Sequence, residues 1–102
     1  MTKKYEFWWA KVKYEDCDEV EVRPVLVIGE YAFIVAYKAT KTDRGNSGSE
    51  LRLIYWKEAG LKEETSIRLE KVLKLTKGDM LEKIGNLDPR DRMRLELRIT
   101  YC

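Results

Sequence analysis

The sequence predicts a small, mainly β protein with one or two short helices near its C-terminal end. Short apolar runs rich in β-branched and aromatic residues recur along the chain, and turn residues separate them at close spacing. A clear helix start signal comes only late. This pattern is typical of a compact, barrel-like antiparallel sheet. We expect residues 1–102 to form a single domain, because a chain of this length with 44% hydrophobic residues can bury one small core.

The first expected strand covers residues 6–14 and is followed by an acidic turn at residues 15–19. Its side chains alternate between two faces, with Trp8, Ala10, Val12 and Tyr14 on one and Trp9, Lys11 and Lys13 on the other. This period of two favours a strand over a helix.

The central stretch, EVRPVLVIGEYAFIVAYKATKT at residues 21–42, is expected to form a hairpin. Its apolar runs, residues 25–28 and 31–36, flank a predicted turn at Gly29-Glu30. An antiparallel pair brings its open ends together. We therefore expect Arg23 and Thr40, one at each open end, to lie close in space.

Later segments continue the pattern. A polar surface loop is expected at residues 43–49, a strand at 50–56 and a glycine-closed helical turn at 57–61. Extended structure resumes at residues 65–75, where a change of apolar phase near 70–71 predicts a bend or bulge.

Two helices are expected at the C-terminal end. Residues 77–84 have apolar residues at helical spacing and Gly85 as a stop. Asp88 and Pro89 form an N-cap and first-turn pair. The segment at 92–100 fits both a strand and a helix, and the start signal favours a helix.

Several function classes are excluded or disfavoured by composition. The absence of histidine removes Ser–His–Asp and Cys–His catalysis, and no cysteine spacing suits a metal, so we expect no metal and no cofactor. Cys17 and Cys102 are expected to be free thiols in the cytoplasm. The apolar runs are too short for a membrane span. Cleavage of RNA remains feasible, because the substrate supplies its own 2′-hydroxyl nucleophile and cationic side chains stabilise the phosphorane.

Four stretches carry a family resemblance: RPVLVI from Arg23, the strand end Ala39-Thr40-Lys41, the run ELRLIYWKEAGLKEETSIRLEKVLKL from Glu50, and the tail at residues 79–87. In this order and spacing, the chain resembles the PemK/MazF-like toxin family of bacterial type II toxin–antitoxin systems. The similarity covers nearly the whole chain.

The resemblance implies an SH3-like barrel with appended helices, usually a homodimer. It also implies sequence-selective, metal-independent cleavage of single-stranded RNA such as mRNA, and a cognate antitoxin protein as partner. Arg23 matches the family's catalytic arginine and Thr40 its hydroxyl residue. Ser66 and Arg68 match positions at the substrate groove or the dimer interface.

Other candidates for the site come from the residues themselves. Lys41 and Arg44 are expected to track an RNA backbone, and Trp9 is a candidate platform for a base. A carboxylate that orients Arg23 or acts as base is one of three: Asp18, Glu19 or Glu21. Two alternatives stay open: a strand-end Arg23 in an ordinary ion pair, and a non-catalytic barrel that binds a protein target, as gyrase poisons do, or nucleic acid.

Overall fold

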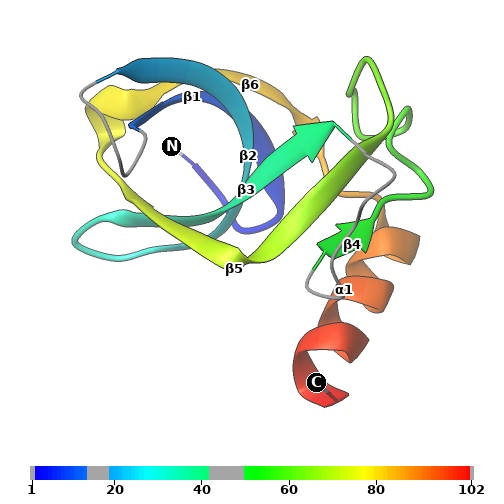
Figure 1. Ribbon diagram of the computed structural model, residues 1–102. Coiled ribbons are helices and arrows are strands. Elements are labelled where there is room, and N and C mark those ends of the chain that lie inside the picture. Colours follow the sequence, from blue (N-terminus) through cyan, green and yellow to red (C-terminus); the bar gives the residue numbers. More distant parts are fainter. Residues whose placement is uncertain (1, 14–18, 42–49, 102) are drawn as a thin grey trace.

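The computed structural model describes residues 2–13, 19–41 and 50–101, and in these ranges it is mainly antiparallel sheet with one α-helix (Figure 1). The elements are β1 (Glu6–Lys13), β2 (Val20–Glu30), β3 (Ile34–Lys41), β4 (Glu50–Arg52), β5 (Thr65–Leu75), the 3₁₀ turn η1 (Lys77–Asp79), β6 (Met80–Asn86) and α1 (Pro89–Tyr101). The predicted fold class is confirmed.

The six strands form one curled sheet in the order β4-β5-β3-β2-β1-β6. β4 and β6 are the edges of this order and do not pair with each other in the described ranges, so the sheet curls without closing. Figure 1 shows β1, β2 and β6 arching together while α1 projects beside β4. No helix among the described residues is both long and apolar enough to span a membrane.

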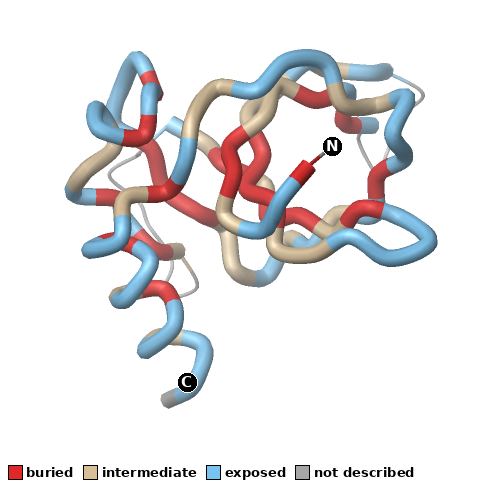
Figure 2. Tube along the Cα trace, turned by 180° about the vertical axis from the view of Figure 1, so that it is seen from behind, coloured by how far each residue is buried: buried red, intermediate tan, exposed pale blue. Residues whose placement is uncertain are grey.

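Two buried clusters lie on opposite faces of the sheet because side chains alternate along each strand. The first cluster contains Phe7, Leu26, Tyr37, Ala39 and Ile67, and it receives Leu95 from α1. The second cluster contains Ala10, Val12, Val25, Val27, Ile34, Ala36 and Leu75. Figure 2 shows the buried stretches in the strands and recurring along α1. The alternation predicted for β1 is confirmed, since Ala10 and Val12 are buried whereas Lys11 and Lys13 are exposed.

The predicted turn at Gly29-Glu30 is wrong. β2 continues to Glu30, and the chain turns at residues 31–33 before β3 begins at Ile34. The β2–β3 register shifts between Val27 and Gly29, and a Cβ on Gly29 would lie 2.9 Å from the ring of Tyr31. The apolar residues at 31–33 therefore belong to the exposed turn. Because they are hydrophobic, the sequence pattern assigned them to the second strand and placed the turn too early in the chain.

The helix predicted at residues 77–84 is also wrong. Only η1 is helical there, and Met80–Asn86 forms β6, which pairs with β1. The helical spacing of the apolar residues was a poor guide, because Leu81 is 45% exposed and does not belong to a buried helix face. Pairing with β1 determines the conformation of this segment instead. Gly85 does not stop a helix. It permits a close approach, since a Cβ there would lie 2.1 Å from the carbonyl oxygen of Ala59.

The strand expected at residues 50–56 is shorter, since β4 ends at Arg52. The turn at residues 56–60 follows, with Gly60 in the left-handed region at φ 91°. The bulge expected near residues 70–71 is confirmed. Tyr37 pairs with Val72 and the next residue, Lys38, pairs with Arg68, so residues 69–71 have no partner on β3.

The final segment is a helix, as favoured. The carboxylate of Asp88 accepts a hydrogen bond from the N–H of Arg90 at 2.9 Å, which confirms the N-cap. Leu95 is fully buried against the sheet, whereas Met93, Leu97 and Ile99 are at least half exposed. The loop expected at 43–49 lies outside the described residues, as does most of the acidic turn.

Candidate functional site

One face of the sheet gathers polar residues from three adjacent strands. In the register of β3 and β5, Thr40 pairs with Ser66 and Lys38 pairs with Arg68. The pairing of β2 with β3 ends at Val25 and Lys38, and beyond it Arg23 and Thr40 both line one cavity. Residues two apart share a face of a strand. Arg23, Lys38, Thr40 and Arg68 therefore lie on one face, which we call the cationic face.

Arg23 lies on β2, opposite Ala10 of β1. Its Nη1 is 2.9 Å from Oε1 of Glu21, and both side chains are about a third exposed. Its Nε is buried and has no hydrogen-bond partner within the described part of the chain. A guanidinium that forms an ion pair with one carboxylate and keeps a further N–H donor without a partner is suited to bind an anion.

Thr40 is half-buried on β3. Within the described residues, its hydroxyl donates a long hydrogen bond, 3.4 Å, to the carbonyl oxygen of Lys41. Its register partner Ser66 is fully buried, so the Ser66 hydroxyl lies beneath the surface. Thr40 is therefore the more accessible hydroxyl of this pair.

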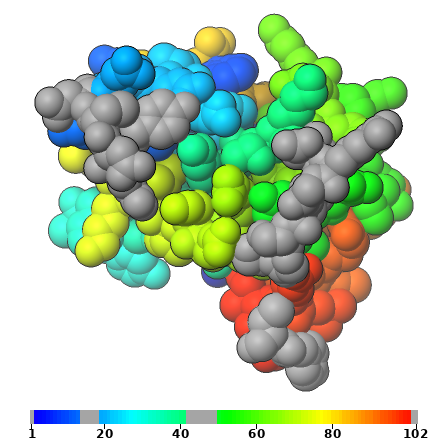
Figure 3. All heavy atoms as spheres, viewed as in Figure 1, coloured from blue at the N-terminus to red at the C-terminus, as the bar shows by residue number. Residues whose placement is uncertain are grey.

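Arg68 extends the cationic face onto β5. It forms ion pairs with Glu50 at 3.6 Å and with Glu70 at 3.4 Å. The first distance joins Nε to Oε1 of Glu50 and is too long for a hydrogen bond, so this buried Nε also has no partner among the described residues. In Figure 3, residues of β2 (blue), β3 (teal) and β5 (yellow-green) adjoin at the surface.

Lys38 lies between Val25 and Arg68 in the sheet register. Burial lowers the pKa of its ammonium, and the nearby charges of Arg23, Arg68 and Lys71 lower it further, while Glu21 opposes them. The cationic face therefore concentrates positive charge at a half-buried position. Sequence reasoning did not single out Lys38, although its spacing of two from Thr40 was the signal that could have found it.

A cavity of about 310 Å³ lies at the ends of β2 and β3, where residues of the cationic face and their sequence neighbours, which alternate to the other face, both line it. Arg23 and Thr40 contribute to its lining, together with Trp9, Pro24 and Lys41. The wall across from the strands comes from the turn and loop at residues 60–63. We call this cavity the Trp9 pocket. Its apolar lining and its position beside Arg23 suit a planar group attached to a phosphate.

The structure brings some predicted residues together and leaves others apart. Lys41 is exposed, and its Nζ lies 3.9 Å from Oε2 of Glu63, which also lines the Trp9 pocket. Of the candidate carboxylates that the structure describes, Glu21 forms an ion pair with Arg23, whereas Glu19 is exposed. Asp18 and Arg44 lie outside the described residues. Among the residues described, no group of three or more His, Cys, Asp or Glu side chains is arranged to hold a metal ion.

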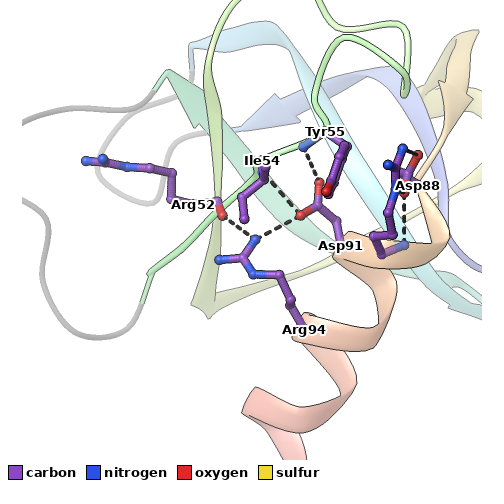
Figure 4. A network of polar contacts seen from close by, with 7 residues as sticks. Arg52, Ile54, Tyr55, Asp88, Asp91 and Arg94 are labelled. Atoms are coloured by element: carbon purple, nitrogen blue, oxygen red, sulfur yellow. Dashed lines mark hydrogen bonds and ion pairs between the residues drawn. The ribbon is translucent and has the colours of Figure 1, made fainter.

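A buried aspartate fixes the segment that leads into the pocket wall (Figure 4). The carboxylate of Asp91 accepts hydrogen bonds from the main-chain N–H of Ile54, at 3.1 Å, and of Tyr55, at 2.7 Å. Arg94 donates to Asp91 and to the carbonyl oxygen of Arg52, both at 2.8 Å. The bond from Tyr55 takes up the next N–H that would face β5 after that of Leu53, so the pairing of β4 with β5 does not continue there.

Comparisons with known proteins place the fold. No protein-family model matches the chain, and no curated protein sequence matches it. A solved structure does match: an endoribonuclease in complex with its cognate antitoxin, from a mycobacterial species. The superposition has a TM-score of 0.73 and 14% sequence identity, and it covers 94% of this chain and 88% of the other. The protein therefore has the fold of that endoribonuclease, as the sequence resemblance implied.

Proposed function

We propose that this protein is an endoribonuclease toxin of a bacterial type II toxin–antitoxin system. It cleaves single-stranded RNA sequence-selectively and without a metal ion, and its chemistry is centred on Arg23 and Thr40. One observation carries this proposal: Arg23 and Thr40 line the same cavity and share their face of the sheet with further cations. The shared fold with an antitoxin-bound endoribonuclease supports it.

The reaction breaks one phosphodiester bond. The 2′-oxygen of the RNA bonds to the adjacent phosphorus, and the bond from phosphorus to the 5′-oxygen breaks. The 2′-hydroxyl gives up its proton to a base, and the 5′-oxygen takes one up. The products are a 2′,3′-cyclic phosphate and a 5′-hydroxyl fragment.

Each residue has a role in this reaction. Arg23 grips the non-bridging phosphate oxygens and stabilises their developing charge. Thr40 hydrogen-bonds the phosphate or the 2′-hydroxyl. Glu21 contacts Arg23, which makes it better placed than Glu19 to orient the arginine or to accept the proton. Ser66 supports Thr40 from below, and Arg68 binds a further phosphate.

Selectivity arises in the Trp9 pocket. Trp9 offers a stacking surface for one base, with Arg23 and Lys41 at hand for the backbone. The cognate antitoxin is expected to occupy the same surface, and the protein is expected to act as a homodimer in the cytoplasm, where mRNA is found.

The test uses purified protein and a long RNA in excess chelator. We expect cleavage into fragments that carry 2′,3′-cyclic phosphate and 5′-hydroxyl ends. Intact RNA, or cleavage that appears only after a divalent metal is restored, would rule out the proposed mechanism. RNA that is bound but never cut would instead favour a nucleic-acid-binding barrel, and toxicity without RNA loss would favour a protein target.

A further inference from the structure

Lys38 occupies the middle of the cationic face, between two guanidinium groups. Arg68 is its register partner on β5, and Arg23 is two residues from its register partner on β2. The positive charges of both guanidinium groups and of Lys71 lower the pKa of the Lys38 ammonium. Three cations from three adjacent strands therefore converge on one half-buried area of the surface.

This arrangement is costly to the fold. Like charges brought together in a partly desolvated place repel one another, and burial of an ammonium adds a desolvation penalty. Glu21, Glu50 and Glu70 offset part of the charge through Arg23 and Arg68. A core position in the same row, Val25, shows that the sheet accepts an apolar side chain beside Lys38.

A second observation points to an anion. The Nε atoms of Arg23 and Arg68 are both buried, and neither has a hydrogen-bond partner in the described ranges. Buried donors are nearly always paired in folded proteins. Two guanidinium groups on the two sides of an ammonium, each with an Nε that makes no hydrogen bond in these ranges, form a donor set that suits phosphate oxygens.

We infer that Lys38 is a further RNA-contacting residue, whose ammonium binds a backbone phosphate between Arg23 and Arg68. This inference rests on the proposed function, because the RNA is the ligand of the same site. It extends the site from the Arg23–Thr40 pair to a phosphate track across β2, β3 and β5. The track would hold the backbone in register while a base enters the Trp9 pocket.

The experiment measures binding apart from cleavage. The probe is a single-stranded RNA of mixed sequence with 2′-fluoro groups, which cannot attack the phosphate. Its affinity is measured by fluorescence anisotropy over a range of salt concentrations for the wild type, Lys38→Met and Lys38→Arg. Lys77→Met is the matched control, because Lys77 is an exposed lysine of η1 that lines a separate cavity with Glu30 and Met80.

We expect Lys38→Met to weaken binding about tenfold at low salt, as loss of a charge-assisted contact does. The slope of log affinity against log salt should flatten by about 0.7, the value for one phosphate contact on a single strand. Lys38→Arg should restore most of the affinity, and Lys77→Met should leave both quantities unchanged.

Two results would overturn the inference: wild-type protein that does not bind the probe, or Lys38→Met protein that binds with unchanged affinity and slope. The two proposals fail separately. If Lys38→Met weakens binding but the wild type never cuts natural RNA, the phosphate contact stands and the nuclease function fails. If the wild type cuts RNA and Lys38→Met binds normally, the nuclease function stands and the Lys38 contact fails.

Discussion

The guanidinium of Arg23 and the carboxylate of Glu21 form an ion pair, with Nη1 2.9 Å from Oε1. The two residues are two apart on β2, so they share one face of the strand. The pair fixes one edge of the guanidinium and leaves its buried Nε without a partner in the described part of the chain. Glu21 therefore sets the direction in which Arg23 can meet a phosphate.

Glu21→Gln is predicted to lower the cleavage rate about 100-fold, because the arginine loses its orienting charge and the site loses its nearest base. Glu19→Gln is the matched control, since Glu19 is an exposed glutamate next to the same strand. Equal rates for Glu21→Gln and Glu19→Gln would assign the base role elsewhere.

Thr40→Val is predicted to reduce cleavage by about 10- to 100-fold with little change in stability. The substitution keeps the β-branched shape and removes only a hydroxyl whose single recorded hydrogen bond is long, 3.4 Å. Thr40→Ser should retain most of the activity. Cleavage rates and melting temperatures of both variants check this, and a Thr40→Val protein with wild-type activity would remove the hydroxyl from the mechanism.

Asp91→Asn is predicted to destabilise the fold by about 2–4 kcal/mol, because the fully buried carboxylate accepts two main-chain N–H bonds and pairs with Arg94. An amide offers one acceptor in place of two. Asp79→Asn, in the more accessible cap of η1, should cost only about 1 kcal/mol. Urea unfolding measures the free energy of unfolding of both variants. If the two lose the same amount, the hydrogen bonds of Asp91 stabilise the fold no more than the cap at Asp79 does.

Lys38→Met is predicted to raise stability at neutral pH, because it removes a desolvated charge near Arg23, Arg68 and Lys71 that Glu21 only partly offsets. The folded state lowers the pKa of Lys38 below the ordinary lysine value of 10.5, chiefly through burial of the ammonium. Between the pKa of Lys38 in the folded state and its pKa in the unfolded chain, the unfolded chain binds more protons than the folded chain. The free energy of unfolding of the wild type therefore rises with pH in this range.

The advantage of Lys38→Met over the wild type should therefore be largest near pH 7 and shrink as the pH approaches about 10. Thermal unfolding of both proteins across this range measures the difference. A gap that stays constant with pH would contradict the lowered pKa of Lys38.

Much of the fold was readable from local patterns. The period of two in β1, the cap at Asp88 and the phase change in β5 each follow from contacts within a few residues, and each matched the structure. Residues 77–84 were misread because pairing with β1 decided their conformation. No local pattern reports such long-range pairing.

The candidate site was only partly readable for the same reason. Arg23 and Thr40 were identified from the hairpin and the family resemblance, and the structure places both in the lining of one cavity. Lys38 has no distinctive motif. Its importance depends on Arg68, which lies 30 residues later and reaches it only through the β3–β5 pairing. Strand pairing in the sheet brings these cations together, and the sequence of a single strand does not reveal it.

The most direct test of the account is the rate of RNA cleavage in chelator by Arg23→Ala, relative to the wild type. Arg92→Ala is the control, because Arg92 is an exposed arginine of α1 paired with Glu96. With folding verified by circular dichroism, Arg23→Ala should lose at least about 100-fold in rate, the effect of removing one donor to a developing oxyanion. Arg92→Ala should cleave like the wild type. An Arg23→Ala protein that cleaves at the wild-type rate would contradict the assignment of the cationic face as the catalytic site.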